Sequence, residues 1–160
     1  MLTGSNEPGV HGPDVRLFDA VRQITQVTVR YADTDAAGIV HYAKYLAYLE
    51  AARAEALRAA GLSRESVAAF ALAAPVVQAT LRYRSPARFD ESLDVTAWVS
   101  DVSEMRCRWR YEIHKHAASD LVLTAETEHD WSESAQRPQT LSAPLGILRA
   151  LNQLEDAWPG

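Results

Sequence analysis

The order of two hydrophobic periods along the chain limits its fold more than any other feature of the sequence. Between residues 42 and 60 apolar residues recur at helical spacing, alanine is abundant, and neither Gly nor Pro interrupts. From Val77 to Thr127 the period changes to two, which is typical of half-buried strands. A single long helix is thus followed by a run of strands, and only that helix is long enough to cover the apolar face of their sheet.

The strand patterns define the rest of the fold class. A first alternating segment begins at Gln23 and includes Val27, Val29 and Tyr31, ahead of the helix. The later alternating segments cover residues 77–83, 93–99, 105–113 and 121–127. Short polar turns at 101–104 and 116–120 favour an antiparallel meander. We therefore predict an α+β fold in which an antiparallel sheet wraps around one long central helix.

Turn and cap signals divide the remaining chain. Gly61 is typical of a left-handed helix end, and Ser63 is suited to cap a short second helix through Phe70. From Pro144 onward, leucines at helical spacing predict a last helix. Residues 1–20 contain several Gly and Pro and no sustained period. We expect a flexible N-terminal extension over residues 1–20 and one domain over residues 21–156.

Composition limits the class of partner and compartment. A chain of 160 residues fits one domain, and 48% hydrophobic residues allow a core. The net charge of −5 argues against a nucleic-acid partner. Cys107 is the one cysteine, so no internal disulfide can form, which suits a reducing compartment. We expect a cytoplasmic protein without a membrane span, because no apolar run is long enough to cross a bilayer.

Residues 29–42 carry the most chemical information. They predict a strand and then a tight polar loop that brings Asp35 to the start of the long helix. The first N–H groups of a helix lack intrahelical acceptors, and the helix dipole is positive there. A carboxylate beside such donors suits acyl chemistry, because it can attack or activate water while the amides hold the oxyanion. Spacing alone favours a simpler role for Asp33, Thr34 and Asp35 in the hydrogen bonds of a turn.

The same residues carry a family resemblance. The pattern Tyr-x-Asp-Thr-Asp-x-x-Gly-x-Val-x-x-x-x-Tyr starts at Tyr31 and is continued by Glu50-x-x-Arg53. It resembles the hotdog-fold acyl-CoA thioesterases, and in particular the group of 4-hydroxybenzoyl-CoA thioesterase and the thioesterase associated with the Tol-Pal system. A second block, Leu81-Arg82-Tyr83-Arg84-Ser85-Pro86-Ala87-Arg88-Phe89-Asp90, follows in the expected order. The resemblance covers about residues 23–145.

The resemblance implies an enzyme that hydrolyses an acyl-CoA to a carboxylic acid and free CoA. It places Asp35 on the family's catalytic carboxylate, as nucleophile or general base, and Asp33 on a supporting position. It assigns the oxyanion site to the backbone N–H of Tyr42, while the Tyr42 side chain is equally compatible with an ordinary core aromatic. It implies no metal and no cofactor. It also implies a homodimer with a shared sheet, commonly paired into a homotetramer.

Several further residues are candidates for substrate binding. Gly38 would let the loop or a substrate pass closely, and His41 would be a helix cap or a pocket wall. Tyr45 would line the acyl pocket. Arg84, Arg88 and Arg106 would suit the phosphates of CoA, although a solvated strand face is the simpler interpretation for most arginines here. The chain departs from 4-hydroxybenzoyl-CoA thioesterase at Ser103, Glu104 and Met105, where that enzyme carries basic residues.

Several alternatives stay open at this point. Glu50 is expected to pair with Arg53 on the helix, yet another hotdog lineage uses a helix Glu as its catalyst, so Glu50 is the fallback. Asp33 with Asp35, or His114 with His116, lack further ligands for a metal. Cys107 is expected to pack in the core. A non-catalytic acyl-CoA-binding or acyl-carrier-interacting module is the second hypothesis, and a hydratase is the third. The sequence does not identify the acyl group.

Overall fold

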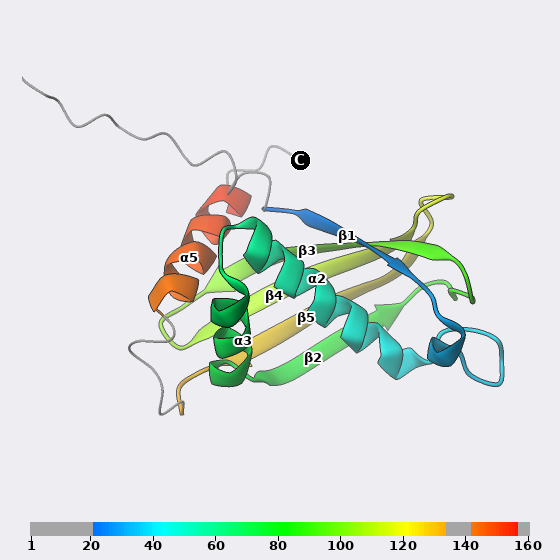
Figure 1. The fold of residues 1–160 in the computed structure, drawn as a ribbon, viewed down its shortest axis with the longest axis horizontal. Helices are drawn as coiled ribbons and strands as arrows, with labels where there is room; N and C mark the ends of the chain where they lie inside the picture. Colours follow the sequence, from blue (N-terminus) through cyan, green and yellow to red (C-terminus); the bar gives the residue numbers. More distant parts are fainter. Residues whose placement is uncertain (1–20, 134–141, 157–160) are drawn as a thin grey trace, which may run out of the picture.

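A five-stranded antiparallel sheet forms one layer of the protein, and helices cover one of its faces (Figure 1). The computed structural model describes residues 21–133 and 142–156, so the predicted extension over residues 1–20 lies outside the described residues. The sheet order is β1-β3-β4-β5-β2. The strands are β1 (Gln23–Thr28), β2 (Val76–Tyr83), β3 (Ser92–Val102), β4 (Arg106–Lys115) and β5 (Leu121–Asp130).

The central helix confirms the helical prediction and begins with a tighter turn. The 3-10 turn η2 (Tyr42–Lys44) leads directly into α2 (Tyr45–Ala59). Gly61, at φ 98°, ends the helix as predicted, because its N–H donates to the Arg58 carbonyl and the Leu62 N–H donates to the Leu57 carbonyl. Ser63 caps α3 (Arg64–Ala73), which continues three residues past the predicted end at Phe70.

The predicted meander is confirmed for β3, β4 and β5, which follow one another as antiparallel neighbours. β2 departs from it, because β2 pairs with β5 at one edge of the sheet while β1 pairs with β3 at the other. Residues 84–91 connect β2 to β3 across the end of the sheet where α2 begins (Figure 1). This connection makes no hairpin, so it leaves β2 free to take the far edge.

The first strand is shorter than its period predicts. β1 ends at Thr28, and Tyr31–Asp33 form a 3-10 turn, η1. The carboxylate of Asp33 accepts the backbone N–H of Arg30, which turns the chain out of the sheet. Tyr31 is therefore 77% exposed instead of continuing the buried face.

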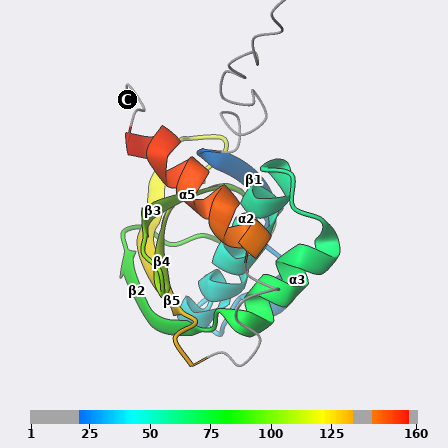
Figure 2. The same ribbon diagram turned by 90° about the vertical axis from the view of Figure 1, so that its left-hand side faces the viewer.

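The core lies between α2 and the concave face of the sheet. α2 buries Leu49, Ala52 and Ala56 against sheet residues that include Val95 and Trp109. α5 (Ser142–Asp156) packs on β3 and lies on the same side of the sheet as α2 (Figure 2). This packing confirms the predicted α+β fold class.

Candidate active site

The loop that carries Asp35 is closed by its own backbone. The Asp35 N–H donates to the Ile39 carbonyl, and the Gly38 N–H donates to the Asp35 carbonyl, each at 2.9 Å. Gly38 has φ 70°, which explains glycine at this position. One carboxylate oxygen of Asp35 accepts the Ala37 N–H at 2.8 Å. The turn role predicted from spacing is thus present, and it leaves the second oxygen of this exposed carboxylate without a donor from the described residues.

Asp33 anchors this loop to the core. Its buried carboxylate accepts the Arg30 guanidinium at 2.9 and 3.1 Å and the Tyr48 hydroxyl at 2.9 Å. The Arg30 guanidinium, above all, lowers the pKa of Asp33 to about 2. Burial raises the pKa of Tyr48, so its hydroxyl remains a donor. Asp33 is therefore a fixed anion that ties the loop to α2, and it is not a group free to react.

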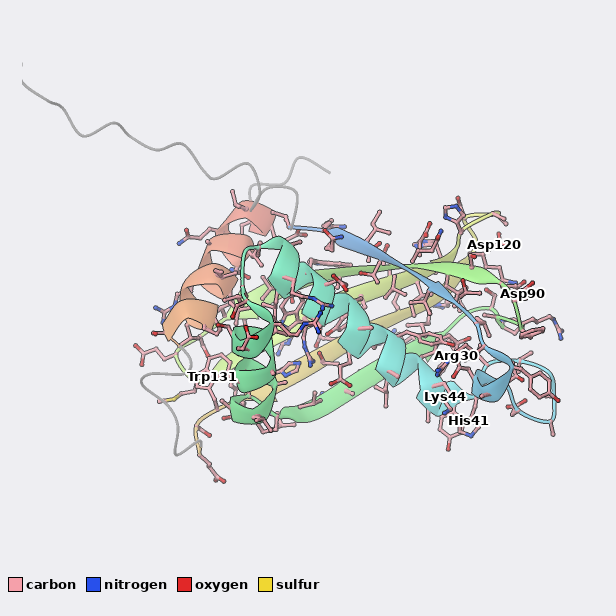
Figure 3. The ribbon with its side chains drawn as sticks, in the orientation of Figure 1. Arg30, His41, Lys44, Asp90, Asp120 and Trp131 are labelled. Atoms are coloured by element: carbon pink, nitrogen blue, oxygen red, sulfur yellow. The ribbon has the colours of Figure 1, made fainter. Side chains whose placement is uncertain are left out.

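The start of the helix offers an open donor beside that loop. The His41 imidazole caps the turn by accepting the Ala43 N–H at 3.2 Å, and its ring stacks on Tyr42 with 4.3 Å between centroids. The Tyr42 N–H is the first of the helical segment and finds no acceptor among residues 21–133 and 142–156. The Tyr42 side chain is 67% exposed, so it is not a core aromatic. Figure 3 shows His41, Lys44 and Arg30 at this end of α2.

A cleft of about 430 Å³ brings the loop and the helix start together, and we refer to it as the Asp35 cleft. Its lining residues are Asp35, Ile39, Val40, Tyr42, Tyr45, Tyr83, Arg84, Ser85 and Pro86. The Tyr83 hydroxyl donates to the Tyr42 carbonyl at 2.9 Å, and its ring lies 5.7 Å from that of the buried Tyr45. The cleft is therefore lined by an acid with an exposed carboxylate, by Tyr42 with its open N–H, by two further tyrosines and by one arginine.

The structure brings some of the predicted substrate-binding residues to this cleft and leaves others outside it. Tyr45 and Arg84 line the cleft, whereas His41 acts as the cap beside it. Arg88 is exposed next to the loop, where its guanidinium lies 3.9 Å from the Cβ position of a residue replacing Gly38. Arg106 lies at the opposite end of the sheet and pairs with Glu128 and Asp130. Within one chain, Arg106 does not reach the Asp35 cleft.

Sequence reasoning did not assign a site role to Tyr83, Ser85 or Pro86. All of them belong to the second resemblance block, and their position in that block is the sequence feature that could have identified them. Their approach to Asp35 depends on β2 taking the edge of the sheet beside β5, which the sequence did not indicate. The isolated bridge between Ile39 and Arg88 joins the two blocks directly.

Two other side-chain predictions have different outcomes. The expected ion pair between Glu50 and Arg53 is wrong, because Arg53 is buried and donates to the His129 ring at 2.9 Å while Glu50 is exposed. The two residues have no ion pair in the part of the chain that the structure describes. Cys107 packs in the core as predicted, and burial raises the pKa of its thiol to about 12.

The described residues contain neither a cluster of metal-ligating side chains nor a helix suited to a bilayer. Within residues 21–133 and 142–156, no group of three or more His, Cys, Asp or Glu side chains is arranged to hold a metal ion. His116 instead contacts Asp94 at 2.9 Å. None of the helices in the described ranges has the length and apolar character needed to cross a bilayer.

Comparison with known proteins shows the family. The model of the thioesterase-like superfamily matches residues 29–151, so the chain belongs to this superfamily. Over 80 residues it is 39% identical to YbgC of Escherichia coli, an acyl-CoA thioester hydrolase. That match covers 50% of this chain and 58% of YbgC, so it spans little more than half of that protein.

Solved structures agree with the observed architecture. A hypothetical protein of Thermus thermophilus, TT1821, is 33% identical, has a TM-score of 0.67 and matches 83% of this chain and 97% of its own. A 1,4-dihydroxy-2-naphthoyl-CoA thioesterase from Synechocystis is 24% identical, has a TM-score of 0.65 and matches 80% and 98% of the two chains. The second likeness concerns the fold alone. The predicted hotdog fold is confirmed.

Proposed function

We propose that this chain hydrolyses an acyl-CoA thioester to a carboxylic acid and free CoA. One observation carries the proposal: Asp35, whose carboxylate is exposed, and Tyr42, whose N–H has no acceptor among the described residues, line the same cleft at the start of the central helix. Membership of the thioesterase-like superfamily and the likeness to YbgC support the same activity. The finer likeness, to 4-hydroxybenzoyl-CoA thioesterase and the Tol-Pal-associated thioesterase, is part of this proposal.

In this proposal, Asp35 and the Tyr42 N–H act on the same carbonyl. Asp35 attacks the thioester carbon, the CoA thiolate leaves, and water then hydrolyses the resulting mixed anhydride. Alternatively, Asp35 takes a proton from water, which attacks the carbonyl directly. In both routes the Tyr42 N–H donates to the oxyanion, and the positive end of the helix dipole stabilises the developing charge. A free oxygen on Asp35 is required in either case, and the turn leaves one.

The walls of the cleft suggest how substrate is held. Tyr45 and Val40 would contact the acyl group, while Gly38 allows a close approach to the loop. Arg84 lines the cleft and Arg88 lies beside the loop, so both are placed to meet CoA phosphates. Arg106 would serve only the site of another subunit. His41 would act by capping the turn that presents Tyr42.

We also propose that the protein is a cytoplasmic homodimer or homotetramer. β2 supports assembly, because it is an edge strand with exposed apolar residues, Val76 at 48% and Val77 at 56%. Such an edge presents unpaired backbone donors and acceptors to a second strand. The buried free thiol of Cys107 suits a reducing compartment. Light scattering during gel filtration measures the oligomeric state.

Release of free thiol from a panel of acyl-CoAs tests the activity. We expect Asp35→Asn to lower kcat/KM by about 10²–10⁴-fold, because it removes the nucleophile or base. Asp90→Asn is the matched control: Asp90 is also exposed, lies at the same end of α2 (Figure 3), and has φ 66°, which Asn tolerates. Turnover of Asp35→Asn equal to wild type would refute the assignment. Saturable acyl-CoA binding by the wild type without thiol release would favour a non-catalytic module.

A further inference from the structure

A second cleft lies farther along α2, on the side of the helix that faces β2. Its volume is about 350 Å³, and we refer to it as the Arg53 cleft. The lining residues are Leu46, Leu49, Glu50, Arg53, Ala71, Ala74, Val76, Ala79, Tyr111 and Thr127. Most of them are aliphatic, and the polar ones come from α2 and the floor of the sheet. No residue is shared with the Asp35 cleft.

The Arg53 side chain is buried in this cleft, with only 8% of it exposed. One guanidinium nitrogen lies 2.9 Å from His129 Nε2. His129 Nδ1 lies 3.0 Å from the Ala74 carbonyl, which can only accept, so Nδ1 carries the proton and Nε2 accepts from Arg53. Thr127 then contacts both His129 and Tyr111, each at 3.1 Å. Arg53 is thus part of a buried hydrogen-bond network with His129, Thr127 and Tyr111.

All the other side chains of this hydrogen-bond network are neutral. Burial, with a smaller effect from Arg53, lowers the pKa of His129 to about 4. Burial also raises the pKa of Tyr111, so its hydroxyl keeps its proton. An arginine, by contrast, keeps its positive charge in proteins. The network therefore holds one positive charge and no negative charge.

No anion of the described residues neutralises Arg53. Arg53 takes part in none of the ion pairs formed among residues 21–133 and 142–156. Glu50 is the one carboxylate that lines the cleft, yet it is exposed and does not pair with Arg53. A buried cation without a counterion is costly, and proteins normally pair such a charge. The arginines of β4, for comparison, each pair with carboxylates of β5.

We propose that the Arg53 cleft binds an organic carboxylate, with the carboxylate group on the Arg53 guanidinium and an apolar body against Leu46, Leu49 and Ala71. The planar fork of arginine matches a carboxylate in geometry and charge. The Arg53 guanidinium has five N–H donors. His129 accepts one of them, which leaves others for a ligand. The aliphatic lining suits a hydrocarbon body. Glu50 at the exposed side disfavours a doubly charged phosphate more than a singly charged carboxylate.

The carboxylate has two possible sources. It is either a free aliphatic acid, or the distal carboxylate of an acyl group whose thioester lies at Asp35; this second source rests on the proposed function. From Tyr42 to Arg53 the helix rises about 16 Å, at 1.5 Å per residue. Only a long dicarboxylic acyl group would span that length. Both sources use the same contact with Arg53, so binding and turnover experiments separate them.

Calorimetric titration of the full chain with decanoate tests the site directly. We expect saturable binding of decanoate, at least tenfold tighter than that of decan-1-ol. Arg53→Gln, which keeps an amide donor for His129 but removes the charge, should abolish this preference, and Arg53→Lys should restore part of it. Arg58→Gln is the matched control, because Arg58 is an exposed arginine of the same helix that pairs with Glu55. Equal affinity for acid and alcohol, or binding unchanged in Arg53→Gln, would overturn the proposal.

A second variant covers the case in which Arg53→Gln does not fold. Glu50→Gln removes the one carboxylate that lines the cleft, so it should tighten decanoate binding at least threefold without altering decan-1-ol binding. Weaker or unchanged decanoate binding in Glu50→Gln would contradict the proposal. Circular dichroism and thermal unfolding establish the folded state of each variant before titration.

Turnover then identifies the source of the carboxylate. We compare kcat/KM for dodecanedioyl-CoA and dodecanoyl-CoA in wild type and Arg53→Gln. A ratio that falls at least tenfold in the variant supports a distal carboxylate on the substrate. An unchanged ratio, with decanoate binding lost, supports a free acid. Failure of the wild type to hydrolyse either thioester would count against the proposed function, while the calorimetric result would still decide the carboxylate site.

Discussion

The start and the middle of α2 hold polar groups under opposite conditions. At the start, Asp35 is exposed in a loop closed by backbone hydrogen bonds, and it shares a cleft with Tyr42, whose N–H has no acceptor among the described residues. In the middle, Arg53 is buried among neutral partners and has no counterion in residues 21–133 and 142–156. Water can solvate the unused oxygen of Asp35, so that charge is stable and available for reaction. Burial keeps water away from the Arg53 charge, so this environment favours the binding of an anion.

Removing the open N–H would test the first end most severely. Tyr42→Pro deletes that donor at a helix position where proline is well accommodated, and His41 has the ψ of 133° that a residue before proline prefers. We expect kcat to fall about 10²–10³-fold, as for loss of one oxyanion donor. Tyr42→Ala, which keeps the N–H, should remain near wild type in the thiol-release assay. Equal losses in both variants would assign the effect to the side chain.

Acid titration would test the surroundings of Arg53. The pKa of His129 is about 4 in the folded protein, below its ordinary 6.5, so between these values the unfolded chain binds a proton that the native protein excludes. The free energy of unfolding should therefore fall as pH falls from 6.5 to 4, by on the order of 3 kcal/mol from this residue. Urea unfolding of wild type and His129→Gln measures the difference. Parallel pH curves for the two proteins would show that His129 is not held neutral.

A smaller effect is expected from the loop that presents Asp35. Gly38→Ala should destabilise the fold by roughly 1 kcal/mol, because φ is 70° while the new methyl group meets no clash. Gly146→Ala is the matched control, since Gly146 lies within α5 in open space and alanine there should stabilise by roughly 0.5–1 kcal/mol. Thermal unfolding reports both signs. A stabilising Gly38→Ala would mean that the loop does not need its left-handed residue.

The smallest effect should come from Glu50, the acid between the start of the helix and Arg53. Glu50 lies eight residues beyond Tyr42, roughly 12 Å along the helix, so we expect Glu50→Gln to change kcat by no more than about twofold. Its thiol release is measured beside that of Asp35→Asn. A large loss in Glu50→Gln with an intact Asp35→Asn would exchange the roles of the two acids.

Local patterns predicted much of the molecule because their causes are local. The helix from Tyr42, its end at Gly61 and the strand faces follow from periodicity and from cap chemistry. The order of the strands does not, because a period of two specifies a face and not a neighbour. The position of β2 in the sheet was therefore not predicted, and neither was the approach of Tyr83 to Asp35.

Long-range pairing limited the prediction of the sites in the same way. Spacing favoured a partner for Arg53 three residues away on the helix, but its partner His129 is 76 residues away in the sequence. Arg106 was expected near CoA because it is basic, whereas the register of β4 and β5 takes it to the other end of the sheet. Asp35 and Tyr42 were easier to predict together, since a single loop joins them.

The edge position of β2 links the two clefts. Val76 and Ala79 form part of the Arg53 cleft, and Tyr83 at the end of the same strand forms part of the Asp35 cleft. A molecule in either cleft would therefore touch the strand that borders the other. If a ligand in one cleft displaced β2 and so altered affinity in the other, thermodynamic reciprocity would make that coupling equal in both directions. β2 is the strand through which the two clefts are in physical contact.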